Sequence, residues 1–158
     1  MSVQTLFEFP HPVNEVSARI VAGTAATLAV LTIAFDLRWM TLVIAYGFVA
    51  RVLTGPTLSP LGQVVTRWVT PRLGLRPKFV AGPPKRFAQG IGAVMSVTAA
   101  ILALGLGEPG AAYVVLGALA LAATLEAAFA FCLGCKIFAL LIRAGVIPES
   151  VCERCVTV

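Results

Sequence analysis

The sequence predicts an all-α membrane protein, a four-helix transmembrane bundle with one amphipathic helix at the membrane surface. Of its 158 residues, 59% are apolar and 12% are charged, whereas an average soluble domain has about 25% charged residues. The mean hydropathy is +0.95, and a soluble domain of this size would need far more polar surface. We expect one integral membrane domain over residues 1–158. The composition argues against a soluble globule, a disordered chain and a nucleic-acid-binding protein, despite the net charge of +5.

Four uncharged runs define the predicted spans, because a helix needs about 17–25 mostly apolar residues to cross the hydrocarbon core. Extended by a few residues where a charged side chain can reach the interface, these runs predict spans at residues 17–37, 39–54, 87–107 and 111–131, and the apolar pattern of the fourth continues to about residue 143. Asn14 is expected to cap the first helix. The second span is short, so a re-entrant hairpin with the first span is the alternative.

The one long polar stretch, residues 55–86, is expected to carry an interfacial helix. Ser59 followed by Pro60 is typical of a helix start, and apolar residues then recur at helical spacing. Trp68 would lie at headgroup depth, and Pro71 is expected to end the helix.

Basic residues set the expected orientation. The polar connection contains no acid, whereas seven basic residues lie in it or beside it. They are Arg51, Arg67, Arg72, Arg76, Lys78, Lys85 and Arg86. Because cytoplasmic loops collect Lys and Arg, we expect this connection and both termini to be cytosolic. The basic residues would then contact anionic lipid, so the expected partner is the lipid bilayer and not nucleic acid.

The four cysteines form two pairs near the end of the chain, Cys132 with Cys135 and Cys152 with Cys155. The C-x2-C-x16-C-x2-C spacing fits a zinc or iron tetrathiolate site. It also fits dithiols that form and break disulfides, and in a third interpretation Cys132 is a small core residue and the tail pair is incidental. A permanent disulfide fits poorly with the reducing cytosol.

Thiol redox or sulfur transfer is the preferred chemistry, because Lys136 directly follows Cys135 and would favour its thiolate. Cys132 and Cys135 would be the working pair. Cys152 and Cys155, in the tail 144–158, would be the pair that resolves the disulfide of the working pair or docks the partner.

Glu126 is the one acidic residue inside an apolar span. A carboxylate at the bilayer centre costs about 2.5–3.5 kcal/mol, so we expect it to be paired, protonated or near the interface. Arg19, Arg51 and Arg86 lie at the cytosolic ends of the other three spans, and an ion pair with one of them is the favoured interpretation. The alternative is a proton or anion site beside the dithiol, where Glu126 would tune protonation.

Three segments together resemble a bacterial membrane family, domain of unknown function 4395, which is common in actinobacteria. They are Pro12-Val-Asn14-Glu with Arg19, Pro84-Lys85-Arg86-Phe87-Ala-Gln89, and Glu126 leading to Phe131-Cys132-Leu-Gly-Cys135-Lys136. The resemblance spans nearly the whole chain. It implies a bacterial inner-membrane protein and, through association with thioredoxin-like and sulfurtransferase proteins, thiol or sulfur metabolism.

The expected function is therefore a multi-pass inner-membrane component of thiol redox or sulfur relay with a cytosol-facing tetracysteine site. A soluble thioredoxin-like or rhodanese-like partner would supply electrons or sulfane sulfur. The alternatives are a scaffold with a structural Zn or Fe site and a small-solute permease.

Overall fold

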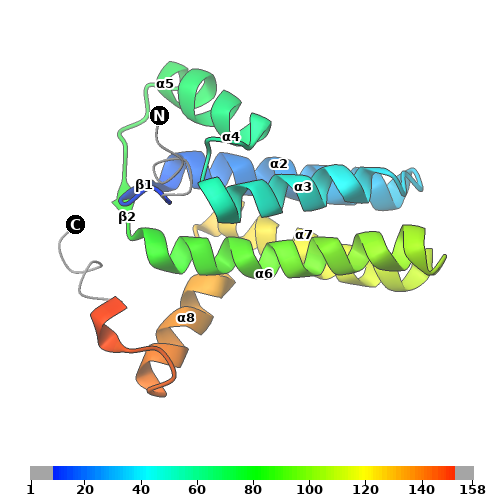
Figure 1. Ribbon diagram of the computed structural model, residues 1–158. Helices are drawn as coiled ribbons and strands as arrows, with labels where there is room; N and C mark the ends of the chain where they lie inside the picture. Colours follow the sequence, from blue (N-terminus) through cyan, green and yellow to red (C-terminus); the bar gives the residue numbers. More distant parts are fainter. Residues whose placement is uncertain (1–8, 152–158) are drawn as a thin grey trace.

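A computed structural model describes residues 9–151 and contains four long helices that lie side by side (Figure 1). The helices are α2 (Glu15–Ala34), α3 (Met40–Thr54), α6 (Gly82–Ala100) and α7 (Pro109–Phe129). α2 packs on α7 and α3, and α6 packs on α3 and α7. The all-α class predicted from the sequence is confirmed.

Among residues 9–151, three helices are long and apolar enough to cross a membrane. They are α2, α7 and the 24-residue helix Gly82–Gly105, in which a π-helical turn (Ile101–Gly105) extends α6. α3 is apolar but has only 15 residues. At about 1.5 Å per residue it is shorter than the roughly 30 Å hydrocarbon core, so a fourth crossing stays a prediction.

The segments before α2 and α6 are tied together at one end of the bundle. β1 (Val13–Asn14) and β2 (Phe79–Val80) pair antiparallel, with Val13 opposite Val80. The Asn14 side chain accepts a hydrogen bond from the Val16 backbone N–H at 3.0 Å, which confirms the predicted cap. The first backbone N–H of α6, that of Gly82, donates to His11 Nδ1 at 3.0 Å.

The polar connection forms one interrupted helix outside the bundle (Figure 1). It consists of α4 (Pro60–Val64), a π-helical turn (Val65–Val69) and α5 (Thr70–Arg72). The predicted start is confirmed, because Ser59 Oγ accepts from the Gly62 N–H at 3.2 Å.

The helix ends at Arg72, one residue beyond the predicted stop at Pro71. The wide turn ends with the Thr70 N–H bonding to the Val65 carbonyl. The ordinary pattern resumes where the Leu73 N–H bonds to the Val69 carbonyl. The change of register falls at Pro71, the position that has no N–H to donate.

The fourth apolar run is not one helix to residue 143 as predicted. α7 ends at Phe129, Ala130 takes a left-handed conformation (φ 55°), and a separate helix α8 (Leu133–Arg143) turns away from the bundle (Figure 1). The break lets one face of α8 pack on α6, with the Phe138 and Phe87 ring centroids 5.5 Å apart. A short 3₁₀ turn (Glu149–Val151) follows.

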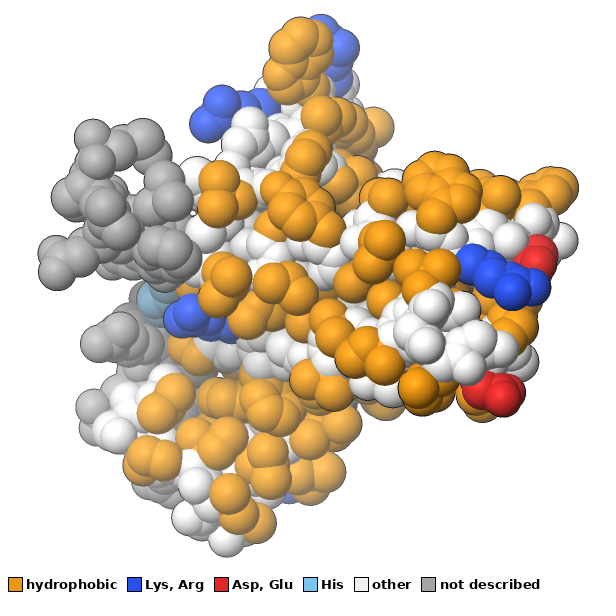
Figure 2. All heavy atoms as spheres, turned by 45° about the vertical axis from the view of Figure 1, so that its right-hand side comes forward, with side chains coloured by type: hydrophobic (Ala, Val, Ile, Leu, Met, Phe, Trp, Pro, Cys, Tyr) orange, Lys and Arg blue, Asp and Glu red, His pale blue; other side chains and the backbone are white. Residues whose placement is uncertain are grey.

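Small side chains fill the core between the long helices, and large apolar ones cover much of the outside (Figure 2). Ala29, Ala99 and Ala112 are fully buried, whereas Leu121 and Val114 are exposed. This distribution is typical of helices that approach one another closely and present apolar side chains to lipid.

Candidate functional site

The break between α7 and α8 places the first cysteine pair at the start of a helix. Cys132 is the N-cap residue of α8 and Cys135 lies in its first turn. Cys132 is buried and Cys135 is half-buried, and both are free thiols. The first N–H groups of a helix lack helical partners and favour negative charge. This location therefore suits a thiolate better than the interior of a continuous helix would.

Two contacts hold the break in place. Arg19 Nε and Nη2 donate to the carbonyl oxygens of Ala127 and Ala128, each at 2.9 Å, and so satisfy carbonyls in the last turn of α7. Gly134 lies directly against α6, where an added Cβ would be 2.5 Å from the Ala88 Cα. Only glycine permits this close approach without displacing backbone.

The two thiols ionise very differently. The Cys135 thiol donates a hydrogen bond to the Cys132 sulfur and lowers the pKa of Cys132 from 9.0 to about 7. Burial and the Glu126 carboxylate oppose this shift, while the Lys85 ammonium supports it. The same hydrogen bond raises the pKa of Cys135, because the donor must keep its proton. The pair therefore has one ready thiolate and one protonated partner near neutral pH.

Glu126 forms its ion pair with Lys85 rather than with an arginine. Lys85 Nζ lies 2.6 Å from Glu126 Oε1, and the two side chains are 8% and 13% exposed. Lys85 is also the cation whose charge acts on both thiols. The Lys136 side chain, for which that role was expected, places its ammonium 5.8 Å from the Phe131 ring centroid.

The three arginines considered as partners of Glu126 make other contacts. Arg19 caps α7 as described, and Arg86 Nε donates to the Val52 carbonyl near the end of α3 at 3.0 Å. Arg51 is 7% exposed; its Nε donates to Gln89 Oε1 at 3.0 Å, and its guanidinium stacks on Phe48 at 4.6 Å.

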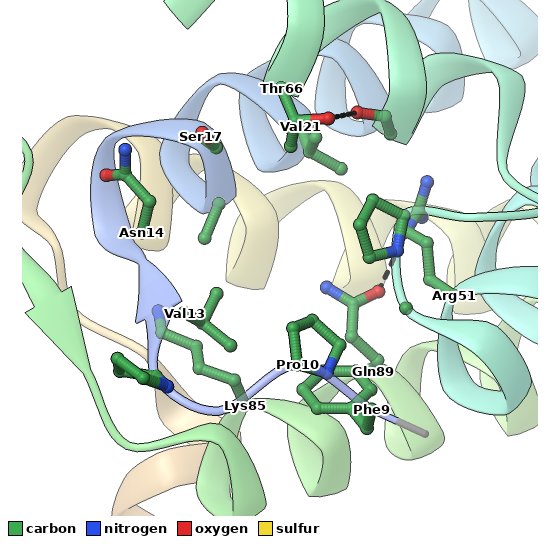
Figure 3. Close-up of a pocket in the computed structure, with 15 residues that line it drawn as sticks. Phe9, Pro10, Val13, Asn14, Ser17, Val21, Arg51, Thr66, Lys85 and Gln89 are labelled. Carbon is green, nitrogen blue, oxygen red and sulfur yellow. Dashed lines mark hydrogen bonds between the residues drawn. The ribbon is translucent and has the colours of Figure 1, made fainter. Parts of the chain in front are cut away.

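Two cavities meet at Arg51 and Gln89. One, of about 290 Å³, is lined by Cys132, Glu126, Arg51 and Gln89 among mostly apolar residues of α2, α3, α6, α7 and α8. The other, of about 170 Å³, lies between the N-terminal segment, α2, α3, α4 and α6, and Lys85 lines it too (Figure 3). Arg51 and Gln89 are therefore shared by a cavity near the thiol and one at the end of the bundle.

Lys85 and Gln89 are site residues that the sequence analysis did not single out for chemistry. Lys85 was assigned to the basic connection, although it precedes Gly92 by seven residues and Ser96 by eleven, the spacing of one helix face. All three are buried. The helical spacing in α6 could therefore have shown that Lys85 lies on the buried face of the helix and its neighbour Arg86 does not.

A possible metal site depends on residues outside the described part of the chain. Within residues 9–151, no three His, Cys, Asp or Glu side chains come close enough to hold a metal ion. Cys152 and Cys155 lie outside the described residues, so the zinc or iron hypothesis and the resolving or docking role remain predictions.

In the part of the chain that the structure describes, these features define an all-helical protein with three helices of membrane-spanning length and a CxxC dithiol beside the Lys85–Glu126 pair. The chain belongs to the family described as Domain of unknown function (DUF4395), whose model matches residues 13–143. The resemblance predicted from the sequence is confirmed. The match runs from β1 to the end of α8 and includes Cys132 and Cys135. No curated protein and no solved structure matches the chain.

Proposed function

We propose that the protein is an integral membrane component of thiol redox or sulfur relay, with Cys132 and Cys135 as its working pair. The observation that carries this proposal is the position of the pair at the start of α8, with Cys132 at the N-cap and Cys135 in the first turn. The polarised pKa values support it, because a thiolate is the nucleophile in thiol exchange.

The two thiols divide the work according to their exposure. Cys135 is half-buried, whereas Cys132 is buried and lines the cavity of about 290 Å³. A thiolate of a soluble thioredoxin-like partner attacks the Cys135 sulfur of the Cys132–Cys135 disulfide. Cys132 leaves as the thiolate, which its lowered pKa favours. The second thiol of the partner then attacks the mixed disulfide, releasing the oxidised partner and Cys135.

A rhodanese-like partner would enter the same cycle with sulfane sulfur. The thiolate of the pair takes the terminal sulfur of the partner's persulfide. The second thiol then attacks the new persulfide, forming the Cys132–Cys135 disulfide and releasing hydrosulfide. The thioredoxin-like partner thus reduces the Cys132–Cys135 disulfide by two electrons. The persulfide instead takes two electrons from the reduced pair.

We place the protein in the bacterial inner membrane with four crossings and both termini in the cytosol. The exposed apolar side chains of the long helices support membrane insertion (Figure 2). The basic connection and α8 lie at the same end of the bundle (Figure 1). Because cytosolic loops collect basic residues, the dithiol would face the reduced side. Trp68, 61% exposed on the connection helix, would lie at headgroup depth.

The test is a reversible two-thiol titration of protein purified anaerobically in detergent. Cys152 and Cys155 are replaced by serine so that only the proposed pair responds. Equilibration with reduced and oxidised dithiothreitol, followed by a maleimide gel shift, should show both thiols lost and recovered together. In the same background, Cys132→Ser should capture glutathione on Cys135 but form no intramolecular disulfide.

Two results would contradict the proposal. One is a pair that never forms an intramolecular disulfide under oxidising buffer. The other is wild-type protein with about one zinc or iron per chain and no titratable thiols, which would favour the metal scaffold. Sidedness is tested separately: an impermeant maleimide should label Cys135 in inside-out vesicles and not in intact cells.

A further inference from the structure

The cavity beside Cys132 has an apolar wall that reaches the outer surface of the bundle. Ala118 of α7 and Leu133 and Ile137 of α8 line it and are exposed. Further in, Ala25, Met95 and Leu119 add apolar surface. In a membrane-embedded bundle such an opening admits molecules dissolved in lipid, and the volume of about 290 Å³ is near the lower end of ligand pockets, roughly 300–1,000 Å³.

The polar groups in this cavity are mainly unused hydrogen-bond donors. Arg51 makes one hydrogen bond, through Nε to Gln89, and within residues 9–151 its two terminal nitrogens make none. Gln89 uses its oxygen for Arg51, and its amide nitrogen points away from that bond (Figure 3). Of the Glu126 carboxylate, Oε1 is already paired with Lys85. A ligand that satisfies this end of the cavity must therefore offer acceptor oxygens.

We propose that this cavity binds a lipid-soluble quinone, whose ring contacts the apolar wall beside Cys132 and whose carbonyl oxygens accept hydrogen bonds from Arg51 and Gln89. A quinone combines an apolar ring, acceptor oxygens and the capacity to take two electrons. The dithiol on the same wall supplies those electrons. The buried charges Arg51, Lys85 and Glu126 sum to +1, which stabilises the negative charge that develops on the ring oxygens.

The inference rests on the proposed thiol chemistry and names its electron acceptor. The Cys132 thiolate donates an electron pair to a ring carbon and forms an S–C bond, and a ring oxygen takes the proton that Cys132 had released. Cys135 then loses its proton to Glu126 and attacks the Cys132 sulfur. The S–S bond forms, the S–C bond breaks, its electron pair stays on the ring, and the second ring oxygen takes the proton that Glu126 had accepted. Overall, two thiols and one quinone become one disulfide and one hydroquinone.

The experiment uses the full chain in detergent, with Cys152 and Cys155 replaced by serine and the remaining pair reduced. A fully ring-substituted short-chain benzoquinone is added, and its reduction is followed by absorbance together with the loss of free thiols. We expect one quinone reduced per two thiols lost. Ala118→Phe, which obstructs the cavity mouth, should slow quinone reduction at least about tenfold. The matched control is Val114→Phe, one turn earlier on α7 and 75% exposed, which does not line the cavity and should match the parent.

Comparison with a soluble oxidant distinguishes the two proposals. In the parent and in both phenylalanine variants, oxidised glutathione, which accepts the two electrons and leaves as two glutathione thiols, should form the disulfide at the same rate. If it does so while the quinone does not, the quinone inference fails and the thiol-redox function stands. If neither oxidant forms the disulfide, the proposed function fails as well. Equal rates of quinone reduction in Ala118→Phe and Val114→Phe would also overturn the inference. So would a fatty acid that protects Cys132 from alkylation when the quinone does not.

Discussion

Replacing Glu126 by glutamine removes the charge that compensates a buried ammonium. Lys85 Nζ and Glu126 Oε1 are 2.6 Å apart, with the side chains 8% and 13% exposed. Breaking a buried pair from one side costs about 3–5 kcal/mol. Because the glutamine oxygen can still accept from Lys85, we expect about 3 kcal/mol for Glu126→Gln, close to the lower limit. For a chain of this size that corresponds to a fall in melting temperature of roughly 6–12 °C.

A double-variant cycle in detergent, followed by circular dichroism on heating, measures the pair as a unit. Lys85→Met should also destabilise, and the double variant should recover about 2 kcal/mol relative to the sum of the single losses. Losses that simply add would refute the reasoning.

The pH midpoint of Cys132 alkylation is a second readout. A purely structural role of the Lys85–Glu126 pair would not shift it in opposite directions in the two variants. The Glu126 carboxylate raises the pKa of Cys132 and the Lys85 ammonium lowers it. The pH midpoint of Cys132 alkylation should therefore fall in Glu126→Gln and rise in Lys85→Met. Midpoints that move in the same direction would contradict the arrangement of charges around the thiol.

Three further predictions concern contacts on either side of the break between α7 and α8. Gly134→Ala should cost about 1–3 kcal/mol by overpacking against Ala88, whereas Gly117→Ala in open space should be neutral or stabilising; melting temperatures compare the two. Arg19→Gln should cost about 1–2 kcal/mol by losing donors to the last turn of α7, measured by the same melts. The pKa of Cys132 is about 7 in the folded protein and 9.0 otherwise, so its thiolate adds stability that is complete above pH 9 and lost as the pH falls through 7. Denaturant unfolding should show stability rising between pH 7 and 9, and iodoacetamide should alkylate Cys132 with a midpoint near pH 7.

The positions of the long helices could be predicted from the sequence because hydrophobicity alone sets them. The predicted span 111–131 and the observed Pro109–Phe129 differ by two residues at each end. The caps at Asn14 and Ser59 were equally predictable, since each is a short-range bond between a side chain and an N–H two or three residues on.

The break after α7 could not be predicted, because neither glycine nor proline marks it. Ala130 takes a left-handed conformation, and the contacts beside it join residues more than forty positions apart, such as Gly134 and Ala88. The partner of Glu126 was missed for a related reason. Sequence position gave Lys85 and Arg86 the same depth in the membrane, and the rotation of α6 decided which of them faces Glu126.

The same break explains how an apolar helix end becomes a site for thiol chemistry. In one continuous helix, the backbone N–H groups around Cys132 and Cys135 would be bonded within the helix and could not stabilise a thiolate. Ending α7 at Phe129 and starting α8 at Leu133 frees the N–H groups of the first turn beside Cys132. It also positions the dithiol next to Glu126 and Lys85, whose charges act on both sulfurs. Loosening the α8–α6 contact with Gly134→Ala should therefore raise the alkylation midpoint of Cys132 as well as lower the melting temperature. A lower melting temperature with an unchanged pH midpoint of Cys132 alkylation would show that the thiolate does not depend on the packing of α8 against α6.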